Sequence, residues 1–237
     1  MFKDNLFKTI PTFVLMFKWI FRIGLLFLVF TVFGVLMLRW IPVTYTPLMF
    51  IRSIQSQTND KLPSGIHHDW VSLSEAGPFP TCVQATEDQN FFDHHGFDFK
   101  AIQYAYEYNK NHEKTIGAST ISQQTAKNVF LWPSRSWVRK GLEVYFTALI
   151  ELLWGKDRIL EVYSNVVELG PDIYGVEAAS QHYFNVSASS LKNNQALNLA
   201  TLLPSPLKYS PIDLNPAQKR KKSRAKKHLK KSGALKF

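Results

Sequence analysis

A long apolar run near the N-terminus constrains this chain more than any other feature of its sequence. Between Trp19 and Trp40 almost every residue is apolar, and one helical crossing of a membrane needs roughly 20 such residues. Arg22 lies one turn into the run, where a long cationic side chain can reach the lipid headgroups. Trp19 and Trp40 stand where interfacial aromatic residues are expected. The run therefore predicts a transmembrane helix over residues 19–40.

Charges around the run predict its orientation. Cations stay preferentially on the cytoplasmic side, so we expect residues 1–18 inside and everything after Trp40 outside. A cleaved signal peptide is the alternative, but the run is long for one and no small-residue cleavage site follows it. The charges are those of Lys3, Asp4, Lys8, Lys18 and Arg22.

The rest of the chain divides into three parts. Residues 41–65 hold several Pro and Gly that break periodicity, so we expect a membrane-proximal linker. Residues 66–215 suffice for one domain with its own core. Residues 216–237 form a basic tail, in which residues 219–231 hold nine cations and no acid. Such a tail binds anionic lipid headgroups or nucleic acid, or it is a solvated, partly disordered end. No basic face on a fold is evident, so nucleic acid is not expected.

Helical periodicity dominates the domain, and no strand alternation is evident, so we predict an all-α fold. The single cysteine, Cys82, is expected in the core and not as a nucleophile. The pair His94-His95 has no third ligand at zinc spacing. The predicted helices cover residues 79–88, 99–109, 120–131, 136–154, 156–166, 176–184 and 194–203.

The first polar cluster ends the predicted helix 79–88. Glu87 and Asp88 are adjacent carboxylates that disfavour each other's ionisation, and Phe91 and Phe92 add desolvation. A general base or acid needs such surroundings near neutral pH. An ordinary capping and salt-bridging cluster is the other interpretation.

A run rich in amides and poor in acids follows. Thr120 and Gln123 have the form of a capping box, so a helix should begin here. Gln124, Lys127 and Asn128 then share one face. Amides suit sugar hydroxyl and acetamido groups, while the ammonium and the N–H groups of the helix start suit a phosphate. A solvated polar face is the alternative.

A third cluster combines cations with one carboxylate. Arg139 and Glu143 form an i, i+4 pair on the predicted helix 136–154. Nearby cations keep Glu143 ionised, the opposite of the expectation for Glu87. Two carboxyl groups held in different charge states suit an acid/base assignment. A single helix salt bridge is the other interpretation.

In their order along the chain, these segments resemble glycosyltransferase family 51, the peptidoglycan glycosyltransferases, and most closely its monofunctional biosynthetic members. The ordered set spans about residues 70–211 and is far more specific than any one motif. The matching segments are Glu87-Asp88, Phe91, His94 and Gly96; Gly117, Ser119-Thr120-Ile121, Gln123-Gln124 and Lys127-Asn128; Arg139-Lys140 and Glu143; Lys156, Ile159-Leu160-Glu161, Tyr163 and Asn165; Tyr174 to Ala179; Tyr183-Phe184; and Leu203 to Pro206.

The resemblance implies a lysozyme-like helical domain with a small membrane-proximal jaw. It also implies lipid II as substrate, an undecaprenyl-diphosphate disaccharide-pentapeptide. Glu87 would deprotonate the acceptor's 4-hydroxyl, which attacks the growing chain's anomeric carbon with inversion and releases undecaprenyl diphosphate. Glu143 would assist in the donor region. The implied substrate-binding residues are the cations Lys127, Arg135, Arg139 and Lys140, and the polar residues Ser119, Thr120, Gln123, Gln124 and Asn128.

The resemblance further implies a single-pass protein of the inner, cytoplasmic membrane with a periplasmic catalytic domain. Its partners would be membrane lipids and the lipid-linked glycan, and other cell-wall or division proteins stay open. No cofactor is implied with certainty, and Mg²⁺ or Mn²⁺ stays open. The rivals are a glycan-cleaving lysozyme-like enzyme or lytic transglycosylase, a bifunctional penicillin-binding protein, for which too little chain is present, and a scaffold.

Overall fold

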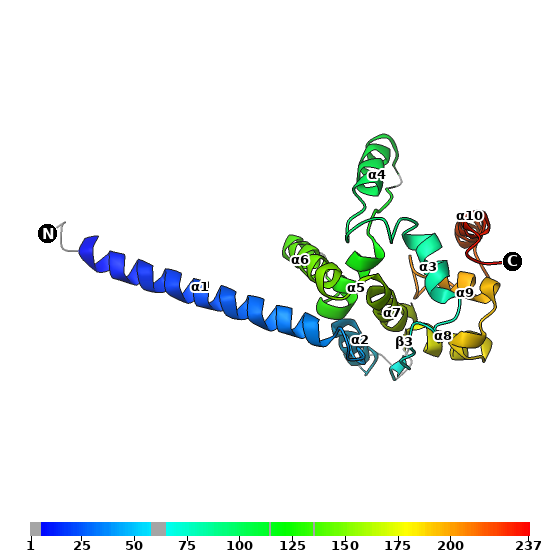
Figure 1. Ribbon diagram of the computed structural model, residues 1–237, viewed down its shortest axis with the longest axis horizontal. Helices are drawn as coiled ribbons and strands as arrows, with labels where there is room; N and C mark the ends of the chain where they lie inside the picture. The colour runs from blue at the N-terminus through cyan, green and yellow to red at the C-terminus, as the bar shows by residue number, and fades with distance from the viewer. Residues whose placement is uncertain (1–5, 58–64, 114, 135) are drawn as a thin grey trace. The chain divides into compact units, whose positions relative to one another are not determined.

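The structure is a computed structural model that separates the chain into two compact units, Met1–Ile41 and Pro42–Phe237 (Figure 1). The first unit holds the apolar run, and the second holds the polar clusters of interest. The residues that the structure describes are 6–57, 65–113, 115–134 and 136–237.

The first unit is one helix, α1 (Leu6–Met37). Its portion Val14–Met37 has a mean hydropathy of 2.4 and is long and apolar enough to cross a membrane. The helix covers most of the predicted range 19–40 and ends at Met37, three residues before Trp40. One apolar N-terminal helix is therefore present, as the sequence predicts.

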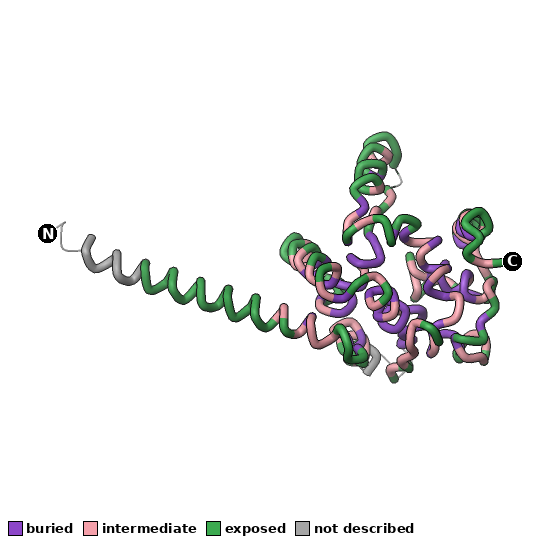
Figure 2. The backbone as a smooth tube through the Cα atoms, viewed as in Figure 1, coloured by how far each residue is buried: buried purple, intermediate pink, exposed green. Residues whose placement is uncertain are grey.

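The core of the second unit is built around α5 (Ile121–Phe130) and α7 (Lys156–Val166), which pack against each other. Figure 2 shows buried backbone concentrated in these two helices and in those that surround them. The mostly helical fold is confirmed, and the predicted helix boundaries differ from the observed ones by no more than three residues. The surrounding elements are α3 (Phe79–Glu87), α4 (Phe99–Asn111), α6 (Trp137–Leu153), α8 (Val176–Phe184), the 3₁₀ turn η1 (Ala188–Ser190) and α9 (Asn193–Ala200).

The predicted capping box is present at the start of α5. The Thr120 hydroxyl accepts a hydrogen bond from the Gln123 backbone N–H at 3.2 Å, and the Gln123 side chain accepts one from the Thr120 N–H at 3.1 Å. This reciprocal pair satisfies two donors that a helix start would otherwise leave open. The Thr120 hydroxyl also donates to the Gly96 carbonyl at 2.6 Å. The start of α5 is thereby fixed to the loop that precedes α4.

A small sheet departs from the expectation of helices alone. Its strands are β1 (His67–His68), β2 (Glu168–Gly170) and β3 (Ile173–Tyr174), in the order β1-β3-β2. β1 runs parallel to β3, and β2 runs antiparallel to it. Strands of two or three residues are too short to show the alternation by which a sequence reveals a strand.

Two further helices lie where the sequence analysis expected none. α2 (Pro47–Gln57) lies in the predicted linker, and Pro47 begins the helix at a position that tolerates proline. α10 (Pro216–Ser232) occupies the basic tail and packs on α3 and α9. The interpretation of that tail as partly disordered is wrong for residues 216–232, which form a helix, although much of this helix is solvent-exposed.

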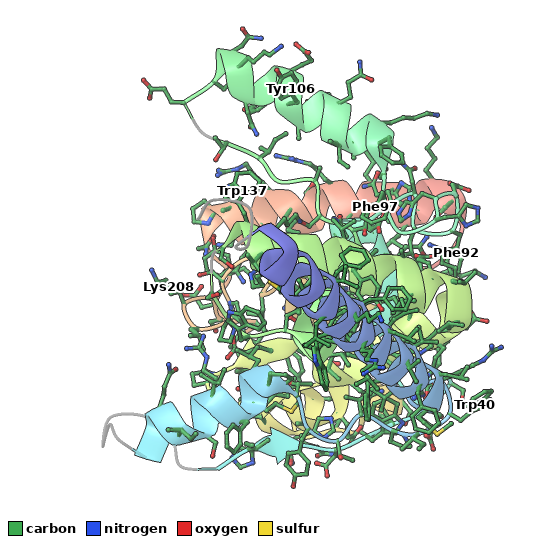
Figure 3. All side chains as sticks on the ribbon, turned by 90° about the vertical axis from the view of Figure 1, so that its left-hand side faces the viewer. Trp40, Phe92, Phe97, Tyr106, Trp137 and Lys208 are labelled. Carbon is green, nitrogen blue, oxygen red and sulfur yellow. The ribbon has the colours of Figure 1, made fainter. Side chains whose placement is uncertain are left out.

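Helix α4 stands off the core in both views (Figures 1 and 3). Only Ala105 is buried along it, and Tyr106 is 61% exposed. Its start is capped by Asp98, whose carboxylate accepts from the Ala101 N–H at 2.9 Å. Its far end is fastened by Asn109, which bonds the backbone of Ile116 through both amide atoms. The helix is therefore held mainly through its two ends.

Candidate active site

A groove on the second unit is formed by two pockets that meet at Gln124. One has a volume of about 540 Å³ and is lined by cationic side chains. Its neighbour has a volume of about 500 Å³ and is lined by Glu87. Gln124 lines both. Each volume lies in the range of small-molecule sites, so the groove can hold a sugar unit on either side of Gln124. We call these the cationic pocket and the Glu87 pocket.

Glu87 is the last residue of α3, and two other helices, α5 and α10, hold its carboxylate. Its Oε2 accepts a hydrogen bond from Gln124 Nε2 at 3.2 Å. Its Oε1 is ion-paired with the Nζ of Lys221 on α10. Gln124 is itself held by the Tyr163 hydroxyl, which donates to its Oε1 at 2.9 Å. Burial, with the charges of Glu87 and Asp88, raises the pKa of Tyr163 well above its usual value, so this hydroxyl keeps its proton.

Asp88 has a structural role distinct from that of its neighbour Glu87. Both of its carboxylate oxygens lie within hydrogen-bond distance of His94 Nε2, at 3.0 and 3.1 Å. One of them also accepts from the Ile121 N–H at 3.0 Å. The start of α5 therefore already has its anion in Asp88, which corrects the expectation that these N–H groups await a phosphate. The adjacent carboxylates Glu87 and Asp88 have separate cationic or imidazole partners.

The cationic pocket is lined by Arg52, Lys127 and Arg139. Lys127 is open to the pocket, yet enough protein surrounds it to lower its pKa, chiefly through lost hydration. The nearby charges of Arg139 and Lys140 lower that pKa further. The buried Nε of Arg139 has no hydrogen-bond partner among the described residues. Such a pocket suits an anion that supplies both charge and acceptors.

Glu143 lies behind the cations and lines neither pocket. Its side chain is 5% exposed. Arg139 Nη1 donates to its Oε2 at 3.2 Å, and Lys140 Nζ is ion-paired with its Oε1. Its charge also raises the pKa of Lys127. Glu143 is thus the counter-ion that holds three cations together.

One carboxylate, that of Glu168, lines the cationic pocket itself. Glu168 lies on β2 and accepts from Arg52 Nε at 3.2 Å. Burial raises the pKa of Glu168, and the Arg52 charge opposes that shift. Arg52 belongs to α2, the first helix of this unit. The helix that follows the apolar segment in the chain therefore contributes a cation to the groove.

Most of the predicted site residues lie together in the groove, with four exceptions, of which Glu143, described above, lines neither pocket. Gln123 is 5% exposed and serves the capping box, and Lys140 lines neither pocket but pairs with Glu143. Arg135 lies outside the described residues. The Glu87 pocket takes in Glu87, Ser119, Thr120 and Gln124, and the cationic pocket takes in Gln124, Lys127, Asn128 and Arg139.

Among the residues that line the groove, the sequence analysis missed three that form ion pairs there, namely Arg52, Glu168 and Lys221. Lys221 was counted only as part of a basic tail, and Arg52 only as part of a linker. An amphipathic pattern in each segment is the signal that could have identified the helices carrying them. Cys82 is buried, and burial raises its pKa to about 12, which agrees with the predicted core role.

Comparisons with known proteins show which proteins this chain resembles. A family model described as Transglycosylase matches residues 55–232, which includes all of α10. A protein of Bdellovibrio bacteriovorus described as "Biosynthetic peptidoglycan transglycosylase" is 56% identical over 193 residues, covering 81% of this chain and 77% of that protein. Proteins with the same description from Caulobacter vibrioides and Bacteroides thetaiotaomicron are 52% and 49% identical. Those two matches each cover 76% of this chain, and 76% and 73% of the relatives.

Proposed function

The chain belongs to the transglycosylase family, and on that premise we propose a role for each side of its groove. The protein is a peptidoglycan glycosyltransferase that polymerises glycan strands. Its substrate is a lipid II-type glycan precursor. A glycan-cleaving activity is not favoured by its relatives. What remains is to assign the proton transfer and the charge stabilisation to particular side chains.

Glu87 is the general base in this proposal. It takes the proton from the 4-hydroxyl of the acceptor sugar, and the oxygen attacks the anomeric carbon of the growing chain. The new carbon–oxygen bond forms as the bond to the diphosphate breaks, so the configuration inverts and undecaprenyl diphosphate leaves. The observation that carries this assignment is the Gln124 side chain, which bonds Glu87 at 3.2 Å and also lines the cationic pocket. Base and cations thereby face one groove.

The cationic pocket receives the departing diphosphate. Lys127 and Arg139 are the principal cations, and Arg52 on α2 is an additional one that lines the same pocket. Fixed cations aimed at developing charge stabilise a transition state without reorganisation. Arg135 stays a predicted member of this set. Lys140 acts indirectly, through its ion pair with Glu143.

Glu143 and Lys221 are positioning residues in this scheme. Glu143 orients Arg139 and Lys140 and touches neither pocket. Lys221 orients Glu87 from α10 and borders the same pocket. Ser119 and Asn128 supply a hydroxyl and an amide group to the sugar and phosphate subsites. Thr120 also lines the Glu87 pocket, but its hydroxyl is bonded to Gly96 and Gln123, so it positions the start of α5.

The proposal also orients the protein. The candidate span Val14–Met37 is consistent with a single membrane anchor. The cations that precede and begin the apolar run favour a cytoplasmic N-terminus. The folded unit then works on the periplasmic side of the inner membrane, beside a substrate and a product that are both lipids. The orientation can be tested with a reporter enzyme that is active only outside the cytoplasm. Fused to the C-terminus, it should be active if this orientation holds.

Glu87→Gln tests the base assignment. The amide keeps the size of the side chain but accepts no proton, so polymerisation of lipid II should fall by about 1,000-fold with the fold intact. The measurement is the initial rate of polymer formation by the full chain in detergent, with circular dichroism as the check on folding.

Glu161→Gln is the matched control, because Glu161 is also ion-paired, with Arg158, and lines neither pocket. Its rate should stay within a few-fold of the unchanged protein. If both variants polymerised lipid II at the same rate, Glu87 would not be the general base. Release of fragments from finished peptidoglycan, without polymer formation, would instead support the glycan-cleaving rival.

A further inference from the structure

Helix α10 carries a stripe of exposed cations that has no role in holding the fold. The four positions are spaced at i, i+4, i+7 and i+11, so they follow one face for about 16 Å. Each side chain is exposed, and none forms an ion pair within the described part of the chain. No acid lies between residues 216 and 237 to offset them. We call this the α10 stripe: Arg220, Arg224, Lys227 and Lys231.

The opposite face of α10 fixes the direction in which the stripe points. Gln218, Ala225 and Leu229 are buried where the helix packs on α3 and α9. The Gln218 amide donates to Thr201 Oγ1 at 3.1 Å and to the Ser210 carbonyl at 3.0 Å. With this face anchored, the stripe faces solvent.

Folding alone does not account for the stripe. Like charges at i and i+4 destabilise a helix, and both Arg220–Arg224 and Lys227–Lys231 have that spacing. Cations near a helix C-terminus are favourable, but only within its last turn. An external anion would offset the repulsion along the rest of the stripe. The charges therefore point to a ligand.

The stripe begins beside the Glu87 pocket. Lys221, which is ion-paired with Glu87 and lines that pocket, lies on α10 between the buried face and the stripe. Arg224 follows Lys221 by three residues and so lies next to it on the helix surface. A polymer that leaves or enters this pocket can thus pass along the stripe.

The position of α10 in the unit favours a polymer over a lipid surface as the ligand of the stripe. The chain enters the unit at α2, directly after the candidate anchor in sequence. α10 lies across the core helices α5 and α7 from α2 (Figures 1 and 3). A membrane that contacts the α2 end would leave the stripe uncovered, whereas the product of the groove would reach it.

We propose that the α10 stripe binds the carboxylates of the peptides carried by the glycan polymer. The proposal rests on the proposed function, because the polymer in question is the product of the groove. Peptide carboxylates are anions that recur along such a polymer, and four cations in a line match a repeated charge. Binding here would hold the strand close to the Glu87 pocket between additions. The contact is electrostatic and will weaken as salt is added.

The test is cosedimentation of the purified full chain, in detergent, with insoluble peptidoglycan. The probes are native peptidoglycan, peptidoglycan whose carboxylates have been amidated, and vesicles of anionic phospholipid. The stripe variant is Lys227→Gln with Lys231→Gln. The control is Lys219→Gln with Lys230→Gln, which removes the same charge from exposed lysines on the other flank of the same helix.

The stripe variant should bind native peptidoglycan about three- to tenfold more weakly, as expected when two exposed ion pairs are lost. The control should change by less than twofold, and amidation should weaken the unchanged protein to the level of the stripe variant. Equal losses in both variants, no effect of amidation, or tighter binding to the vesicles would each overturn the proposal. The amidation arm uses the unchanged protein, so it decides even if a variant fails to fold.

Initial polymerisation rates separate this inference from the proposed function. Lys227 and Lys231 line neither pocket, so the stripe variant should keep its initial rate on lipid II. Loss of binding with rate retained supports the stripe. If Glu87→Gln polymerises normally while the stripe still binds, the catalytic assignment is wrong and the stripe stands. If Glu87→Gln is inactive and the stripe variant binds normally, only the stripe fails.

Discussion

The two pockets of the groove each depend on an ion-paired glutamate, but the cations that pair with these glutamates come from different parts of the chain. Glu143 is paired with Arg139 and Lys140, which lie four and three residues before it on α6. Glu87 is paired with Lys221, which lies 134 residues further along the chain and on another helix. One arrangement is fixed by helical spacing alone, and the other needs α10 to pack on α3.

This difference separates the chemistry of the two sides. Glu87 lines its pocket with 14% of its side chain exposed, so an incoming hydroxyl can reach it. Glu143 is 5% exposed, and Arg139 and Lys127 stand at the pocket surface instead. The Glu87 pocket therefore presents a carboxylate to a proton, and the cationic pocket presents positive charge to a diphosphate. Changes on the cationic side should affect charge stabilisation without removing the base.

Lys127→Met gives the largest effect expected on the cationic side. Removal of a fixed cation at the departing charge should lower kcat/KM for lipid II by about 100-fold or more. The Glu87 pocket is left intact, so binding of a short acceptor glycan should not change. The measurement is steady-state polymerisation together with acceptor binding by the variant. A loss of acceptor affinity as large as the loss in rate would contradict the separation of the two pockets.

Lys127→Arg tests the role of the Lys127 charge through the pH dependence of activity. Lost hydration lowers the pKa of Lys127, so its charge disappears as pH rises through that lowered value. An arginine stays protonated across this range. The alkaline fall in activity should therefore lie at higher pH in the variant than in the unchanged protein. A pH–rate profile with the same alkaline limb in both would mean that another group sets it.

Glu143→Gln removes the counter-ion and keeps the size and shape of the side chain. Arg139, Lys140 and Lys127 would then repel one another without a nearby anion, so the free energy of unfolding should fall by about 2 kcal/mol. Inorganic diphosphate should restore more stability to this variant than to the unchanged protein, because it binds only the folded cationic pocket. Thermal unfolding with and without diphosphate measures both effects. No recovery with diphosphate would mean that Glu143 does not organise an anion site.

The local parts of the groove are the parts that the sequence predicts. The capping box of Thr120 and Gln123 needs only residues three apart, and the Arg139–Glu143 pair needs only one helical turn. The shared face of Gln124, Lys127 and Asn128 follows from the same periodicity. For these residues the helix period alone fixes which side chains meet, so the sequence predicts their arrangement.

The parts built by long-range packing are not predictable in this way. Lys221 is one of nine cations in its segment, and nothing in that segment indicates which of them meets Glu87. Arg52 reaches Glu168 across 116 residues, through a helix that begins at a proline. Gln123 lies in the segment that was expected to bind substrate, yet its side-chain oxygen accepts the Thr120 N–H in the capping box. Sequence patterns reveal which chemistry is present, and tertiary contacts decide which residues carry it.

Lys221→Met gives the smallest expected effect and tests the long-range side of the comparison. Without the ammonium, the Glu87 carboxylate is less well oriented toward the acceptor hydroxyl. The rate of polymerisation should therefore fall by about tenfold. Lys221→Arg should restore much of the rate. Lys222→Met is the control, because Lys222 is adjacent on α10 but has no carboxylate partner among the described residues. An unchanged rate in Lys221→Met, or an equal loss in Lys222→Met, would leave the base without its proposed long-range partner.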